Sequence, residues 1–88
     1  MRILYKFEWD CGRQGTLEGV FISTSEEINK IIGKEIYFGE VLGKHSEVFG
    51  TIEKEEIEEL TDDQDFIDKF EILIGSIGYN PLDYYEED

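Results

Sequence analysis

The sequence predicts a single α+β domain. Three observations carry this prediction: an opening segment that alternates apolar and polar residues, two β-type runs around a polar break, and two helix patterns with capping residues. The expected element order is β-β-α-β-β-α. The simplest architecture for that order is one four-stranded, mostly antiparallel sheet with both helices on one face. With 88 residues, 40% of them hydrophobic, the chain forms one domain (1–88) with a small core.

The first two strands are predicted from side-chain alternation. Residues 2–9 alternate apolar and polar side chains, with Leu4 as the only exception, as a strand with one buried face does. A loop with two glycines follows. Thr16–Ile22 then resumes as a second strand that Gly19 weakens. We expect these two strands to pair in antiparallel orientation.

The first helix is predicted to begin at Thr24. Thr24 is the N-cap residue and Glu27 completes a capping box. Gly33 ends the helix at the position where a left-handed residue is usual. The apolar stripe of this short helix is Ile28, Ile31 and Ile32.

The second helix is predicted from a capping box that begins at Thr61 and reaches Gln64. Gly75 ends it. Its stripe of apolar residues, which we expect to cover the sheet, is Phe66, Ile67, Phe70, Leu73 and Ile74.

A hairpin is predicted between these helices, with Ile36–Leu42 and Glu47–Ile52 on either side of the break at residues 43–46. The preferred register pairs Val41 with Val48 and Tyr37 with Ile52. It also places Gly39 opposite Gly50, so that an aromatic ring, a helix or a ligand must pack on the bare backbone.

The sequence leaves a second register open. A three-residue turn would place a different set of side chains inside. That set is Phe38, Leu42, Val48 and Ile52.

Two segments give weaker signals. Glu53–Leu60 is interpreted as irregular, although an edge strand or one helical turn fits its residues as well. The tail, residues 76–88, contains the turn dipeptide Asn80-Pro81 and several apolar side chains. We therefore expect it to dock in part before its acidic end.

The charge of the chain is concentrated in its second half. The net charge is −14. Residues 1–46 hold seven acids and six bases, whereas residues 47–88 hold fifteen acids and only Lys54 and Lys69. Such a one-sided field attracts basic partners and repels nucleic acid and anionic membranes. The alternative is that acidic side chains serve only solubility.

The acidic run gives the leading candidate site. A row of carboxylates can imitate the phosphate track of DNA, although a solvated helix face is the commoner meaning of such a run. We expect eight carboxylates and two exposed tail tyrosines to contact a partner. They are Glu55, Glu56, Glu58, Glu59, Asp62, Asp63, Asp65, Asp68, Tyr84 and Tyr85.

The turn at residues 43–46 gives the alternative site. Lys44, His45 and Ser46 provide donors suited to a phosphate, but the context of a P-loop is missing and an ordinary hairpin tip explains them as well.

We expect no catalytic residues, no metal and no cofactor. Nucleophilic catalysis would need Cys11 or a serine to be activated by His45, the single histidine, and Cys11 and His45 lie in different predicted loops. A tetrahedral zinc site needs more Cys and His than the chain has. The acidic segment does not match a calcium-binding loop.

Two segments resemble small uncharacterised proteins of bacteria and phages. They are Tyr37–Val48, YFGEVLGKHSEV, and Gly78–Leu82, GYNPL. This resemblance implies no activity. In size and acidity, though not in motif, the chain is also similar to phage anti-defence proteins, including anti-CRISPR proteins and DNA mimics.

These observations predict a non-enzymatic, cytoplasmic protein that inhibits a larger protein by occupying its basic, nucleic-acid-binding surface. The alternatives are a nucleotide- or small-ligand-binding module that uses the turn at 43–46, alone or as a homodimer, and a small enzyme. No direct nucleic-acid or membrane binding is expected, because the chain is strongly acidic.

Overall fold

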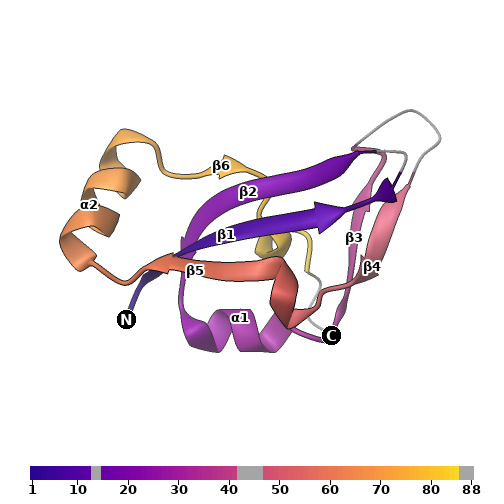
Figure 1. Cartoon of the computed structure of the whole chain (residues 1–88), viewed down its shortest axis with the longest axis horizontal. Helices are drawn as coiled ribbons and strands as arrows, with labels where there is room; N and C mark the ends of the chain where they lie inside the picture. The colour runs from indigo at the N-terminus through magenta and orange to yellow at the C-terminus, as the bar shows by residue number, and fades with distance from the viewer. Residues whose placement is uncertain (13–14, 42–46, 86–88) are drawn as a thin grey trace.

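The computed structural model describes residues 1–12, 15–41 and 47–85. Within them, six strands and two α-helices form a mixed α+β fold (Figure 1). In chain order, these elements are β1 (Ile3–Asp10), β2 (Thr16–Ser23), α1 (Ser25–Ile31), β3 (Glu35–Gly39), β4 (Val48–Thr51), β5 (Ile57–Thr61), α2 (Gln64–Leu73) and β6 (Ile77–Gly78).

Four strands form an antiparallel sheet in the order β5-β1-β2-β6. The predicted pairing of the first two strands is confirmed, and its register runs from Ile3 opposite Ser23 to Asp10 opposite Thr16. Both the α+β class and the four-stranded antiparallel sheet are therefore as predicted.

The membership of that sheet differs from the prediction. β3 and β4 pair only with each other and form a separate two-stranded sheet. Their expected places are taken by β5, from the segment interpreted as irregular, and by β6, from the tail. β5 binds the free edge of β1, where Ile57 lies opposite Phe7. Strand propensity alone does not specify which strands become neighbours, because side-chain packing across the sheet decides the pairing.

The preferred hairpin register is wrong. Tyr37 lies opposite Phe49, and Ile36, rather than Gly39, lies opposite Gly50. Tyr37 points outward and is 53% exposed. The alternative register predicted an inward-facing set of four side chains. Phe38, Val48 and Ile52 of that set are buried as predicted, while Leu42 lies outside the described residues.

The expectation that something packs on Gly50 is correct, and the partner is the indole ring of Trp9. A Cβ atom at Gly50 would lie 2.6 Å from Cζ2 of Trp9, too close for any real contact. Gly50 thus allows the β3–β4 hairpin to approach the end of β1.

Phe38 is the centre of the aromatic core. Its ring centroid lies 5.9 Å from that of Phe7, 5.5 Å from Trp9 and 4.7 Å from Tyr84. Phe7 and Trp9 belong to β1 and Tyr84 to the tail, so one side chain of the hairpin joins the four-stranded sheet to the C-terminal segment.

The C-terminal segment runs back along the domain (Figure 1). β6 pairs with β2, where Gly78 lies opposite Gly19. A side chain at Gly19 would collide with the backbone of Tyr79. Gly19, which weakened the prediction of the second strand, is therefore the residue against which the C-terminal segment packs. Pro81 is fully buried beyond it.

The two helices lie on opposite faces of the sheet, not on one face as predicted. α1 buries Ile28 and Ile31 in the main core with Tyr5 of β1. α2 lies against the other face, where Leu4 and Ile67 are buried outside that core cluster. Leu4, the exception in the alternation of β1, is thus what α2 covers.

The helix starts agree with the sequence for α1 only. The Thr24 hydroxyl accepts a 3.2 Å hydrogen bond from the backbone N–H of Glu27, as predicted. α2 begins two residues later than predicted, because Asp63 is its N-cap and accepts from the N–H groups of Asp65 and Phe66. Thr61 ends β5 instead.

Replacing Gly50 by Ala is expected to destabilise the fold by about 1–3 kcal/mol, since the new methyl group collides with Trp9. Chemical denaturation followed by circular dichroism measures this change. The exposed neighbour Thr51→Ala is the control. In a Trp9→Ala background the cost of Gly50→Ala should fall, and an unchanged cost would show that the ring is not responsible.

Replacing Asp63 by Ala should cost about 0.5–2 kcal/mol of stability, because two backbone N–H groups lose their acceptor. Asp62→Ala is the matched control and should change stability by less than about 0.5 kcal/mol. Equal effects of the two substitutions in urea denaturation would contradict the assignment of the cap.

Candidate functional site

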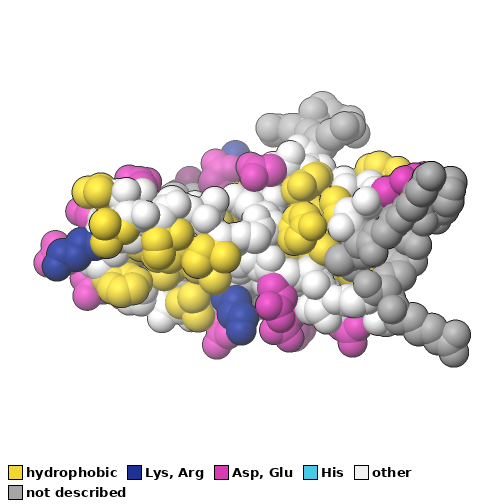
Figure 2. Space-filling model, turned by 90° about the horizontal axis from the view of Figure 1, so that it is seen from above, with side chains coloured by type: hydrophobic (Ala, Val, Ile, Leu, Met, Phe, Trp, Pro, Cys, Tyr) yellow, Lys and Arg dark blue, Asp and Glu magenta, His cyan; other side chains and the backbone are white. Residues whose placement is uncertain are grey.

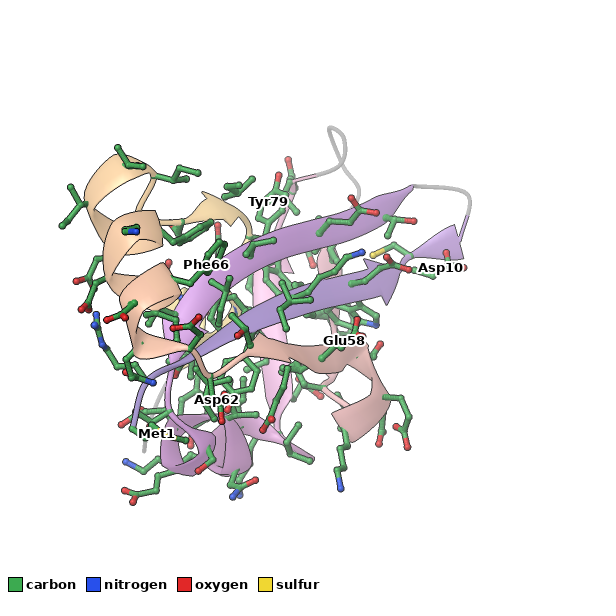
Figure 3. The ribbon with its side chains drawn as sticks, turned by 60° about the vertical axis from the view of Figure 1, so that its left-hand side comes forward. Met1, Asp10, Glu58, Asp62, Phe66 and Tyr79 are labelled. Atoms are coloured by element: carbon green, nitrogen blue, oxygen red, sulfur yellow. The ribbon has the colours of Figure 1, made fainter. Side chains whose placement is uncertain are left out.

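The predicted partner-binding carboxylates lie along β5, the turn before it and the first half of α2. Seven of the eight are exposed, and Glu56 is half-buried. In Figure 3, Glu58 lies on β5 and Asp62 lies in the connection to α2. The structure therefore distributes these acids along one edge of the sheet and around the end of the domain.

Three of the eight carboxylates also have local structural roles. Glu56 accepts a 2.7 Å hydrogen bond from the N–H of Glu53, and Asp63 caps α2. Asp68 pairs with Arg2, which also lies 3.0 Å from Glu71. The Asp68 hydrogen bond is the largest factor that raises the pKa of the Arg2 guanidinium.

The other five carboxylates make no side-chain hydrogen bond or ion pair with the described residues. They are Glu55, Glu58, Glu59, Asp62 and Asp65. Their charges are therefore available to a partner.

The acids do not form a single row on one face. Successive side chains of β5 point to opposite faces of the sheet, so Glu58 and Glu59 diverge. Glu59 lies opposite Tyr5 and lines a hollow of about 300 Å³ between β5 and α1. Burial, and next the charge of Glu59, raise the pKa of the Tyr5 hydroxyl. The carboxylates thus surround the sheet edge.

The tail tyrosines are less exposed than expected. Tyr84 and Tyr85 are half-buried and pack against the main core, and Tyr84 lies on Phe38. Their first role is structural, and a partner would reach only their outer edges.

The sequence did not predict an exposed apolar surface beside these acids. Of the expected α2 stripe, only Ile67 is buried, whereas Phe66 is 51% and Leu73 80% exposed. Together with Leu60 of β5, Ile74 and Ile77, they form what we call the α2 apolar face, which gathers over α2 and the adjoining end of the sheet (Figure 2).

One signal in the sequence pointed to this surface. Ile72, Leu73 and Ile74 are consecutive, and residues in a helix are spaced by about 100°. Three apolar neighbours therefore span roughly 200° of the helix end, more than one sheet face can cover.

The α2 apolar face is hollowed where it meets the sheet. A depression of about 350 Å³ is lined by Leu4, Leu60 and Phe66, with Thr61 and Asp63 at its polar side. Figure 3 shows Phe66 on the side of α2 that faces the strands. An apolar side chain of a partner fits a depression of this kind.

Lys44, His45 and Ser46 lie outside the described residues, so the ligand-binding alternative stays a prediction. Among residues 1–12, 15–41 and 47–85, no cluster of three or more His, Cys, Asp or Glu has the geometry of a metal site. In the same ranges no helix is long and apolar enough to span a membrane.

Cys11 is a weakly acidic thiol. It is half-buried, and its Sγ atom lies 3.7 Å from the backbone oxygen of Trp9. Burial is the main cause that raises its pKa, and the charges of Asp10 and Glu56 add to the effect. The thiolate needed for nucleophilic attack is therefore disfavoured at neutral pH.

Comparisons with known proteins add no relative. No family model matches the chain, no curated protein matches it, and no solved structure matches its fold.

Alkylation of Cys11 by iodoacetamide is expected to have a pH midpoint above the ordinary thiol value of 9.0, because burial favours the protonated form. Mass spectrometry of the labelled fraction against pH measures the midpoint. The urea-unfolded chain is the control and should titrate at the ordinary value. A folded-state midpoint at or below that of the unfolded chain would contradict this assignment.

Proposed function

We propose that this protein is a non-enzymatic inhibitor that binds a basic, nucleic-acid-binding surface of a larger protein, in the manner of a DNA mimic. The observation that carries the proposal is the charge of residues 47–88, with fifteen acids against two bases. Five of the predicted contact acids have no side-chain partner in the described part of the chain, which supports an intermolecular role.

The field of such a surface explains the choice of partner. A cluster of exposed carboxylates lowers the potential over the sheet edge and the first half of α2, and this attracts Lys- and Arg-rich surfaces. Proteins that bind DNA present such surfaces to its phosphates. Occupation of that surface by this protein would exclude the nucleic acid by direct competition. An anti-defence role is one setting in which such an inhibitor acts.

The first experiment is capture from a lysate of the source cell on immobilised protein, with washes of rising salt concentration. The expected result is a basic nucleic-acid-binding protein that is released by high salt and displaced by duplex DNA. Binding of that purified target is then measured by calorimetry. Binding that is insensitive to salt, or a complex that binds DNA and this protein together, would contradict the proposal.

A charge-neutralised variant tests the residues. The variant changes four acids whose side chains make no hydrogen bond or ion pair in the described part: Glu55→Gln, Glu58→Gln, Glu59→Gln and Asp65→Asn. At about 0.5 kcal/mol per exposed ion pair, target binding should weaken roughly 30-fold.

The matched control removes the same number of charges elsewhere on the surface. It carries Glu18→Gln, Glu26→Gln, Glu35→Gln and Glu40→Gln, all at exposed positions. This control should bind almost as tightly as the unchanged chain. Equal loss in both variants would mean that only net charge matters, and no loss in the first would refute the assigned surface.

A further inference from the structure

Exposed apolar side chains are concentrated in one part of the molecule. Nine large hydrophobic side chains are exposed in the described part of the chain, and six of them lie between residues 60 and 77. Figure 2 shows hydrophobic side chains over α2 and the adjoining sheet. Single exposed hydrophobic residues are normal, but a contiguous group with a polar rim marks an interaction surface.

Few side chains of α2 are buried against the rest of the domain. It has ten residues, a length at which an isolated helix is marginal in water. Only Ile67 is fully buried, and Phe66 and Leu73, seven residues apart, lie on one flank of the helix and are exposed. The sheet thus covers only part of this side of α2, and the exposed side chains are free to pack against a second element.

We propose that the α2 apolar face binds an amphipathic, cationic helix of the partner protein. This inference rests on the proposed function, because it describes the apolar centre of a contact whose acidic periphery carries that proposal. The contact surface of the partner helix is an apolar stripe flanked by Lys and Arg side chains.

The shape of the surface favours a helix. The α2 apolar face follows a helix of ten residues, about 15 Å long, which matches about three turns of a partner helix. Side chains of such a partner can pack between those of Phe66 and Leu73, and one of them can enter the depression beside Leu60. The neighbouring edge of β6 is a poorer docking site, since β6 has only two residues.

The charge around the face selects a cationic partner. Asp62, Asp63 and Asp65 lie at the start of α2, and Glu58 lies on the adjoining strand. Arg2 pairs with Asp68 and Glu71, and Lys69, on α2, is a second base, so an acidic surplus remains. A second copy of this chain, with a net charge of −14, would bring the same acids against these, so the charge favours a basic partner over a second copy.

The probe is a synthetic helical peptide of Leu and Lys, roughly three to four turns long, with all Leu on one face. A peptide of the same composition in scrambled order keeps the charge but loses the apolar face. A third peptide has Glu in place of Lys. Binding to the full chain is measured by calorimetry, and sedimentation reports whether the chain associates with itself.

Substitutions in the α2 apolar face test whether this surface, and not another exposed apolar site, binds the peptide. Leu73→Ser removes the most exposed side chain of the face, and Phe66→Ser with Leu73→Ser removes two. The matched control is Tyr37→Ser with Phe49→Ser, a stacked and half-exposed aromatic pair on the β3–β4 hairpin. Circular dichroism checks the fold of each, and Leu73→Ser serves alone if the double variant loses structure.

The amphipathic Lys peptide should bind at least about tenfold more tightly than the scrambled peptide. The variants of the α2 apolar face should abolish that difference, while the hairpin control keeps it.

Equal binding of the two Lys peptides overturns this inference and leaves the electrostatic proposal standing. Equal binding of the Glu peptide overturns the cationic assignment. Self-association that disappears in Leu73→Ser, without peptide binding, assigns the face to a second copy and overturns the inference as well. Peptide binding that depends on the patch but not on Glu55, Glu58, Glu59 and Asp65 supports the apolar contact and counts against the proposed function.

Discussion

The fold depends on the aromatic contacts of Phe38. This ring belongs to β3 of the two-stranded sheet, and it contacts β1 of the four-stranded sheet through Phe7 and Trp9 and the tail through Tyr84. A core this small has few large side chains to bury, so each aromatic ring carries a large share of the hydrophobic free energy. The close approach of Trp9 to the backbone at Gly50 completes the same contact.

This arrangement also determines what is left for binding. The main core uses one face of the four-stranded sheet, and α1, the hairpin and the tail all pack there. The other face is covered only in part, by Ile67 of α2 over Leu4. An apolar surface consequently remains exposed beside the most acidic part of the chain, and in the proposed contact these two features would be the apolar centre and the charged periphery.

Some acids of this segment are paired within the fold, and others are not. Asp63 caps α2 and Asp68 pairs with Arg2, so these two charges are partly committed within the fold. Glu58 and Asp65 have no such partner in the described residues and remain free to act between molecules. Local hydrogen bonds are short-range, whereas the field of exposed charges extends over about 8–10 Å at ordinary salt, so one acidic segment could both stabilise the fold and attract the proposed partner.

The sequence by itself determined the α+β class, the paired strands β1 and β2, the start of α1 and the concentration of acids after residue 46, because these depend on local periodicity, capping and composition. Only the tertiary structure decided that β5 and β6, rather than the hairpin, complete the sheet, that Asp63 rather than Thr61 begins α2, and that Phe66 and Leu73 face water. The physical reason is that the spacing of apolar residues shows which face of a helix or strand is apolar. Which other segment covers that face depends on packing between residues distant in the chain.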